Sequence, residues 1–314
     1  MTLLSLAQAW NEFFFAPQPP TAISLFRVLY GMLLIANLTF LRPDWLAWYS
    51  EHSWVTLPTM LKLEPVPRLN LFTVIPRDDR WVEALFWIFL ASAVSLTVGF
   101  LTRTSSVIAF LCLTSIQQRN LFITHSGDTF LRVAGFFLMF APAGAALSID
   151  RMLRVRKGKE GPEIQPKPPW AQRMIQIELA LLYFVTFWWK STGATWVNGT
   201  AVYYLNHLAE YQGLPVPSWL QHPIFEKLGS WLTLAIEFSL GLLVWFKELR
   251  YPVLLLGLLF HLFLEYRLDV PLFQWTVLSA YVLFIDPRDL DRALGLLRTA
   301  VMKKVPALSA PGPY

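Results

Sequence analysis

The sequence predicts an all-α membrane protein, a single domain over residues 1–314 built as a bundle of about eight transmembrane helices. Three observations predict this fold class. Of 314 residues, 55% are hydrophobic and 15% are charged, and the mean hydropathy is positive. Apolar runs long enough to cross about 30 Å of hydrocarbon recur along the chain. Most basic residues lie in the segments between these runs, as is usual for membrane proteins.

The elements follow from the apolar runs in order. Residues 1–20 lack a basic start and a small-residue cleavage site, so we expect an interfacial amphipathic helix there and not a removable signal peptide. Pro142 and Gly144 could interrupt the fourth span, and the last two spans are short. The predicted spans are 21–41, 81–100, 104–124, 129–147, 170–189, 228–246, 251–266 and 270–285.

The charge of the connecting segments predicts the orientation. The loop 151–169 and the tail 287–314 are strongly basic and should be cytoplasmic. Eight spans then place both termini inside, and the loops 42–80 and 191–227 outside with interfacial helices of their own. The loop 42–80 also carries basic residues, but it is long and rich in proline and aromatic residues, so the orientation stands. We expect a multi-pass protein of a bacterial inner membrane, with its site facing the periplasm.

Composition also excludes some functions. The net charge of +5 does not indicate nucleic-acid binding, because the basic residues follow the loops. Cys112 is the single cysteine and lies in an apolar run, which excludes an intramolecular disulfide and a CxxC thiol relay. Any redox chemistry would therefore depend on a cofactor or substrate.

Ionisable residues gather in the predicted outer half of the membrane. Such groups cost at least a few kcal/mol each unless they pair or face a wet cavity. A structural interpretation pairs Arg119 with Asp128, and Arg132 with Glu237, between helices. The residues concerned are Arg119, His125, Asp128, Arg132, Lys190, His261 and Glu265, with Glu237 near mid-span and Arg27 as an inner exception.

Four of these residues have alternative interpretations. Asp128 lies where a turn ends and a helix begins, which is typical of an N-cap. His125 could be an interfacial residue without chemistry. His261 and Glu265 share a helix face at i,i+4, yet no third ligand has recognisable spacing, so we predict no metal site.

Lys190 is the strongest candidate for chemistry. Gln176, Tyr183 and Lys190 recur every seven residues and therefore line one face of the fifth span, which should face a cavity. Desolvation lowers the pKa of a lysine in such a place, so that the neutral amine could act as a base. His261 or His125 could tune it. The alternative is a snorkelling anchor beside the interfacial tryptophans, among them Trp196.

A series of short motifs occurs along most of the chain. They are Phe26-Arg27, Gly31, Trp48-Tyr49-Ser50, Gly99, Thr102-Arg103, Asn120, Gly127-Asp128, Pro142-Ala143-Gly144, Ser148-Ile149-Asp150, Gln176, Tyr183, Lys190, Trp196, Gly199-Thr200-Ala201, Glu237 and Phe260-His261. In this order they resemble the horizontally transferred transmembrane (HTTM) domain family, which is related to the membrane part of vitamin K-dependent gamma-carboxylase.

The resemblance implies roles for several residues. Carboxylase-like relatives use a lysine at the end of a corresponding helix to deprotonate vitamin K hydroquinone, and Lys190 matches that lysine in local context. His261 matches a histidine of the later helix, whereas His125 is only near a family histidine. The family site faces the lumen, in agreement with the outer position predicted from loop charge. A quinol is therefore the expected cofactor, by resemblance alone.

Three functions remain open at this level. The first is a membrane enzyme, possibly carboxylase-like, with Lys190 as base on a quinol or another amphipathic molecule. The second is a non-enzymatic partner of a secreted peptide or a neighbouring extracytoplasmic protein. The third is a small-molecule transporter, although no inverted repeat is visible. The carboxylase's large extramembrane domain has no counterpart in the matching motifs, so the resemblance does not imply the substrate.

Overall fold

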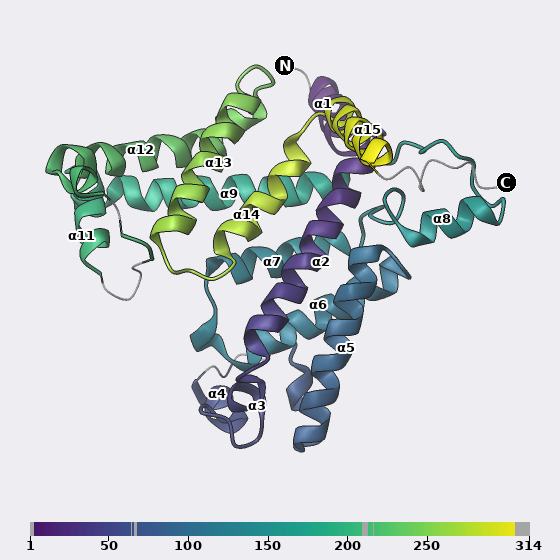
Figure 1. Ribbon diagram of the computed structural model, residues 1–314, viewed down its shortest axis with the longest axis horizontal. Helices are drawn as coiled ribbons and strands as arrows, with labels where there is room; N and C mark the ends of the chain where they lie inside the picture. Colours follow the sequence, from purple (N-terminus) through teal and green to yellow (C-terminus); the bar gives the residue numbers. More distant parts are fainter. Residues whose placement is uncertain (1–2, 64, 66–67, 209–212, 216, 305–314) are drawn as a thin grey trace.

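The computed structural model describes residues 3–63, 65, 68–208, 213–215 and 217–304, and this part of the chain is all-α, as predicted (Figure 1). The helices that correspond to the predicted spans are α2 (Thr21–Leu41), α5 (Asp79–Val98), α6 (Thr102–Arg119), α7 (Ser126–Leu138), α9 (Trp170–Thr192), α12 (Pro223–Gly241), α13 (Arg250–Arg267) and α14 (Phe273–Tyr281). Shorter or peripheral helices are α1 (Leu3–Phe15), α3 (Trp45–Tyr49), α4 (Leu57–Leu63), α8 (Ile149–Arg156), α10 (Ala194–Val197), α11 (Ala201–His207) and α15 (Pro287–Lys304).

Apolar character is unevenly distributed over these helices. Within the described residues, α2 and α5 are long and apolar enough to cross a membrane by length and mean hydropathy, and a shorter apolar helix covers Phe273–Phe284. The helices α6, α9, α12 and α13 have 18 to 23 residues but carry more polar side chains. The eight crossings and the orientation of the termini therefore stay predictions.

Two predicted spans are shorter as helices than the sequence suggested. The fourth was expected over 129–147, but α7 ends at Leu138 after 13 residues, about 20 Å at about 1.5 Å per residue. Pro142 explains the early end because it has no N–H and disfavours helical backbone at the residue before it. The chain turns there, with Ala145 N donating to Pro142 O at 3.0 Å. In the eighth, α14 has 9 residues and continues as a 3-10 turn, Val282–Phe284.

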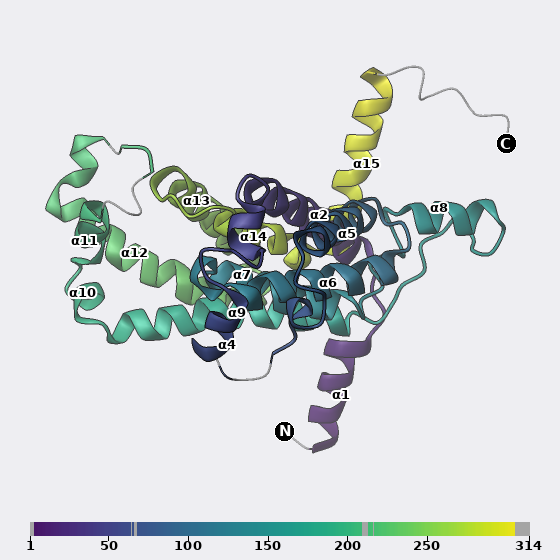
Figure 2. The same ribbon diagram turned by 90° about the horizontal axis from the view of Figure 1, so that it is seen from below.

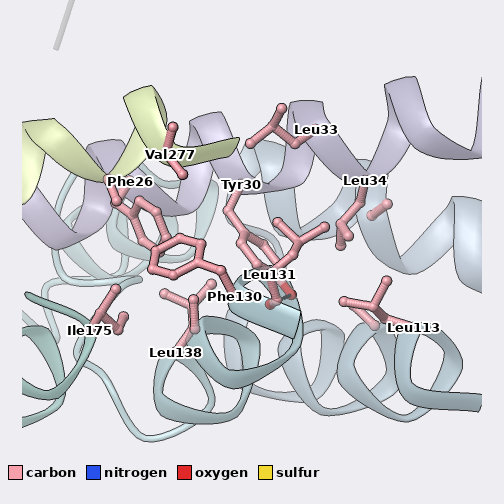
Figure 3. Close-up of a cluster of buried hydrophobic side chains, with 14 of the residues drawn as sticks. Phe26, Tyr30, Leu33, Leu34, Leu113, Phe130, Leu131, Leu138, Ile175 and Val277 are labelled. Carbon is pink, nitrogen blue, oxygen red and sulfur yellow. Dashed lines mark hydrogen bonds between the residues drawn. The ribbon is translucent and has the colours of Figure 1, made fainter. Parts of the chain in front are cut away.

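The core lies where α2, α6, α7, α9 and α14 meet (Figure 3). Phe26 and Phe130 are fully or almost fully buried, and the Tyr30 hydroxyl donates to Leu131 O at 3.0 Å. Burial of apolar groups gains little against lipid tails, so close packing and such polar contacts must hold these helices together. This core supports the starts of both α7 and α14, which border the site described below.

Glycines bring the helices close at two places. A Cβ on Gly31 of α2 would overlap the Thr97 hydroxyl of α5, and one on Gly257 of α13 would overlap the Tyr281 hydroxyl of α14. Small residues of this kind let membrane helices approach. Gly257 thereby makes room for a tyrosine that belongs to the polar network of the site.

One end of the bundle is fastened by a carboxylate on α8. Asp150 Oδ1 accepts from Leu101 N at 2.9 Å, and Oδ2 accepts from Thr102 N and Oγ1 at 2.8 and 2.7 Å. Burial acts to raise the pKa of Asp150, but these hydrogen bonds and the nearby Arg154 outweigh it and hold the pKa below its usual range. The carboxylate thus caps the first turn of α6 from the predicted cytoplasmic side.

The helices at the two ends of the described chain stand apart from the bundle. Figure 2 shows α1 and α15 projecting in opposite directions, crosswise to α6 and α9. The predicted helix within residues 1–20 is present as α1, whereas its position in the membrane interface stays a prediction.

Candidate functional site

A cavity of about 740 Å³ lies between α9, α11, α12 and α13, near the starts of α7 and α14. Figure 1 shows the long helices α9, α12 and α13 grouped together, with α11 at one end of α9 and α12. Most lining side chains are apolar, including Phe225, Leu232, Phe260, Phe263 and Phe273. A cavity with apolar walls and few polar groups is typical of a small-molecule site.

The polar part of this cavity is centred on an ion pair between α9 and α12. Lys190 Nζ lies 2.5 Å from Glu237 Oε1 and 4.7 Å from the centre of the Trp196 ring. Lys190 stands in the last turn of α9, where the negative end of the helix dipole favours a cation. Glu237 Oε2 is buried and has no hydrogen-bond partner among the described residues. The pair therefore leaves one buried acceptor oxygen of Glu237 unpaired among the described residues.

A second polar group in the cavity links α9, α13 and α14. Tyr183 Oη lies 2.6 Å from His261 Nε2 and 3.0 Å from Tyr281 Oη, and His261 Nδ1 lies 2.5 Å from Gln274 Oε1. An amide oxygen can only accept, so His261 carries its proton on Nδ1 and its Nε2 accepts from Tyr183. Tyr281 then donates to Tyr183. Because both ring nitrogens of His261 are hydrogen-bonded, its role in the cavity is to position Tyr183.

His125 also lines the cavity, but its ring and backbone cap the first turn of α7. Its Nδ1 accepts from Gly127 N at 3.0 Å, and its backbone N donates to Asp128 Oδ2 at 2.9 Å. These two contacts form a capping box in which His125 is the N-cap and Asp128 the third helical residue. The N-cap predicted at Asp128 is therefore misplaced by three residues, although Asp128 does cap the helix.

A family model described as the HTTM domain matches residues 15–288 of the chain. The chain belongs to the HTTM family. The match contains the whole cavity and indicates a membrane domain of the gamma-carboxylase type. No solved structure matches the chain.

The HTTM domain brings six of the ten predicted site residues to the cavity wall: His125, Tyr183, Lys190, Trp196, Glu237 and His261. The other four lie outside it. Gln176 donates to Leu283 O at 2.6 Å and ties α9 to the 3-10 turn that follows α14. Arg119 donates to Ser50 O, Ser53 Oγ and Val55 O, which fixes the segment after α3.

The ion pairs expected between helices are not the ones formed. Arg132 donates to Gln117 Oε1 at 3.0 Å, and Gln117 in turn donates to Asp128 O. Among the described residues, Arg119 donates to the segment after α3, and Glu237 takes Lys190 as its partner. The expected pairs Arg119–Asp128 and Arg132–Glu237 are therefore wrong. Helix adjacency decides the partner of Glu237, because α12 packs along α9 and not along α7. For Arg119 and Asp128, which lie on neighbouring helices, local contacts decide, since the Asp128 carboxylate caps α7 and Arg119 donates to the segment after α3.

Sequence reasoning missed Gln274 and Tyr281, both members of the network around Tyr183. A signal was present, because these two residues are seven apart on one short helix, the same spacing that identified Tyr183 and Lys190 on α9. Arg267, which lines the cavity from the end of α13, was also missed.

The suggested metal pair at His261 and Glu265 is not assembled. Both nitrogens of His261 have partners, and Glu265 Oε1 accepts from Trp275 Nε1 at 2.8 Å. No group of three histidine, cysteine or acidic residues in the described part of the chain could hold a metal ion.

Proposed function

We propose that this HTTM domain is a membrane enzyme in which Lys190, coupled to Glu237, removes a proton from a quinol-like or other amphipathic substrate at a site facing the outside. The observation that carries the proposal is the 2.5 Å contact between Lys190 and Glu237 at the wall of an apolar cavity. Membership of the HTTM family supports it, because the resemblance to vitamin K-dependent gamma-carboxylase implies a lysine in that role.

The ion pair explains where the proton goes. Lys190 can act as a base only after its ammonium proton moves to Glu237 Oε1, which lies at hydrogen-bond distance. A neutral amine and a neutral carboxyl suit an apolar cavity better than two charges do. The proton of a substrate hydroxyl would then pass to Lys190, so the pair as a whole gains one proton and the substrate becomes an anion.

The polar network gives the substrate a second contact. Tyr183 lines the cavity, and its hydroxyl is held by His261 and Tyr281 from two other helices. Because its single proton is donated to His261, the Tyr183 hydroxyl could offer its remaining lone pair to a substrate hydroxyl and so help to orient it. His261 contributes by positioning Tyr183 and not by direct proton transfer.

The cavity fits a ring-bearing molecule with a polar head. Aromatic side chains from three helices, Phe225, Phe260 and Phe273, line it, and Lys190, Glu237 and Tyr183 supply its polar wall. A quinol bound there would supply reducing electrons, while the residues of this chain would orient its ring and hold the proton of its hydroxyl.

Mass spectrometry of organic extracts from the purified protein tests this proposal. We expect enrichment of a quinone or related amphiphile over an unrelated membrane protein from the same cells, and reduced enrichment in Lys190→Ala. Lys227→Ala is the matched control, because Lys227 also stands over a tryptophan, Trp231 at 4.9 Å, yet does not line the cavity. Equal recovery from all three proteins would contradict the proposal, and co-purification of a peptide would favour the peptide-partner function.

A further inference from the structure

A second polar position in the same cavity lies at the end of α13. Arg267 lines the cavity, is 7% exposed, and stands six residues beyond His261, about 9 Å along the helix axis at about 1.5 Å per residue. Its position separates it from the network around Tyr183.

Arg267 has no carboxylate partner among the described residues. Its Nε donates to Asn206 Oδ1 at 3.2 Å and its Nη2 to Asn206 O at 3.4 Å, both neutral oxygens on α11. No hydrogen bond from Nη1 is formed to the described part of the chain. A buried guanidinium has five N–H donors in a fork that matches a carboxylate, so most of this capacity is open.

A balancing charge lies on the other side of Asn206. Glu226 of α12 is 4% exposed and accepts from Asn206 Nδ2 at 2.9 Å, but it does not line the cavity. The Asn206 amide thus stands between the arginine and the carboxylate. This arrangement explains how a buried arginine is tolerated while its charge still faces the cavity.

The charges of the cavity wall do not cancel. Among the described lining residues, the lysine and arginine side chains are Lys190 and Arg267, and the single acidic one is Glu237. Lys190 and Glu237 neutralise each other at 2.5 Å, which leaves the charge of Arg267. In an apolar cavity an uncompensated charge attracts an opposite one strongly, since the local dielectric constant is low.

We infer that Arg267 binds a carboxylate carried by the substrate, so that the substrate of this site is a monoanionic amphiphile with its reactive end at Lys190 and its charge near the end of α13. This inference rests on the proposed function for the reactive end, but the anion subsite itself depends on Arg267 alone. It names the ligand class as an apolar chain or ring system with one carboxylate.

Competition binding with two probes of equal chain length tests the subsite. Radiolabelled dodecanoate is bound to the purified full chain in non-ionic detergent at about pH 8, and unlabelled dodecanoate and dodecanol compete for it. We expect dodecanoate to bind more tightly than dodecanol in the wild type. In Arg267→Gln, dodecanoate should bind about tenfold more weakly while dodecanol is unchanged, as for the loss of a charge-assisted hydrogen bond.

A second variant, with the opposite expected effect on dodecanoate binding, separates a loss of binding from a loss of folding. Glu226→Gln keeps the shape of the side chain and removes the balancing charge, so it should tighten dodecanoate binding about threefold or more. If Arg267 and Glu226 served only to join α11, α12 and α13, both variants would weaken binding of both probes. That outcome, or no preference for dodecanoate in the wild type, would overturn the inference.

The double variant Lys190→Met/Glu237→Leu separates this inference from the proposed function. It removes the two opposite charges of the pair together, so the net charge of the cavity wall is unchanged and we expect the preference for dodecanoate over dodecanol to remain. A preference lost in this double variant and kept in Arg267→Gln would assign the anion to the Lys190–Glu237 pair and overturn the subsite. A preference kept in the double variant, with no ligand enriched in organic extracts from the wild type, would leave the subsite standing and count against the enzyme.

Discussion

Glu237 and Asp150 are both carboxylates that contact a neighbouring helix, and their surroundings are opposite. Both oxygens of Asp150 are occupied by three donors from the first turn of α6. Glu237 has one partner on Oε1, none on Oε2 among the described residues, and a cavity beside it. A saturated carboxylate joins two segments, whereas an unsaturated one beside a cavity retains capacity for a ligand.

Substitutions at these two positions should therefore have different effects on stability and function. Loss of Asp150 removes hydrogen bonds that nothing else in the fold replaces. Loss of the whole Lys190–Glu237 pair removes two charges whose burial is costly. The free energy of unfolding should therefore be little changed, while function is lost. Each prediction below tests one side of this contrast.

The largest effect is expected at Lys190. Lys190→Ala should lower turnover of the ligand identified from extracts by about a thousandfold, within the range for loss of a general base. Lys190→Arg keeps the cation but cannot give up a proton near neutral pH, so it should be nearly as inactive. Initial rates in detergent measure both. An active Lys190→Arg, together with a normal Lys227→Ala, would identify Lys190 as an interfacial anchor.

The largest loss of stability is expected on substitution of Asp150. Asp150→Asn should lower the free energy of unfolding by about 3 kcal/mol, because a charged acceptor of three hydrogen bonds becomes neutral and one oxygen becomes a donor. Thermal unfolding of the detergent-solubilised protein measures this. Glu163→Gln is the control, since Glu163 is exposed. Equal midpoints for the two variants would remove the distinction drawn for Asp150.

The Tyr183 network should give intermediate losses of activity. Tyr183→Phe removes an acceptor that would orient the substrate hydroxyl and should lower turnover about tenfold, as for one lost hydrogen bond. Tyr281→Phe removes only a donor to Tyr183 and should cost less. Rates for the two variants under saturating substrate measure this order. A larger loss in Tyr281→Phe would mean that the network does not act through Tyr183.

The smallest effect is a pH dependence of stability. The pKa of Asp150 is lowered in the folded protein, so its contribution is present above the unfolded value of about 3.9 and is lost as the pH falls through the folded value. Glu160 acts in the same direction, since hydrogen bonding from Arg154 lowers its pKa. The difference in unfolding midpoint between wild type and Asp150→Asn should therefore shrink from about pH 5 towards pH 3. A constant difference would contradict this account.

Apolar periodicity predicted the order of the long helices, and the observed bounds of α2 coincide with the predicted span. The seven-residue spacing on α9 placed Tyr183 and Lys190 on one face, and both line the cavity. The same reasoning failed for Gln176, which is satisfied by a backbone carbonyl of another helix. Residue spacing identifies side chains on one face of a helix, but it does not show which part of the protein packs against that face.

Partners between helices could not be predicted because they depend on which helices are neighbours. Arg132 and Lys190 were equally reasonable partners for Glu237 until α12 was found along α9. Helix ends depend on single residues in the same way. The early end of α7 follows from Pro142, and the box formed by His125 and Asp128 sets its start.

The double variant Lys190→Met/Glu237→Leu tests the central contrast most directly, through its thermal unfolding midpoint in detergent. Replacing a buried ion pair by apolar side chains of similar volume is often neutral or stabilising. If the pair is present for function, the midpoint of the double variant should equal or exceed that of the wild type. A fall as large as that of Asp150→Asn would show that the pair holds the fold together, and would contradict the assignment of Lys190 and Glu237 to a reactive site.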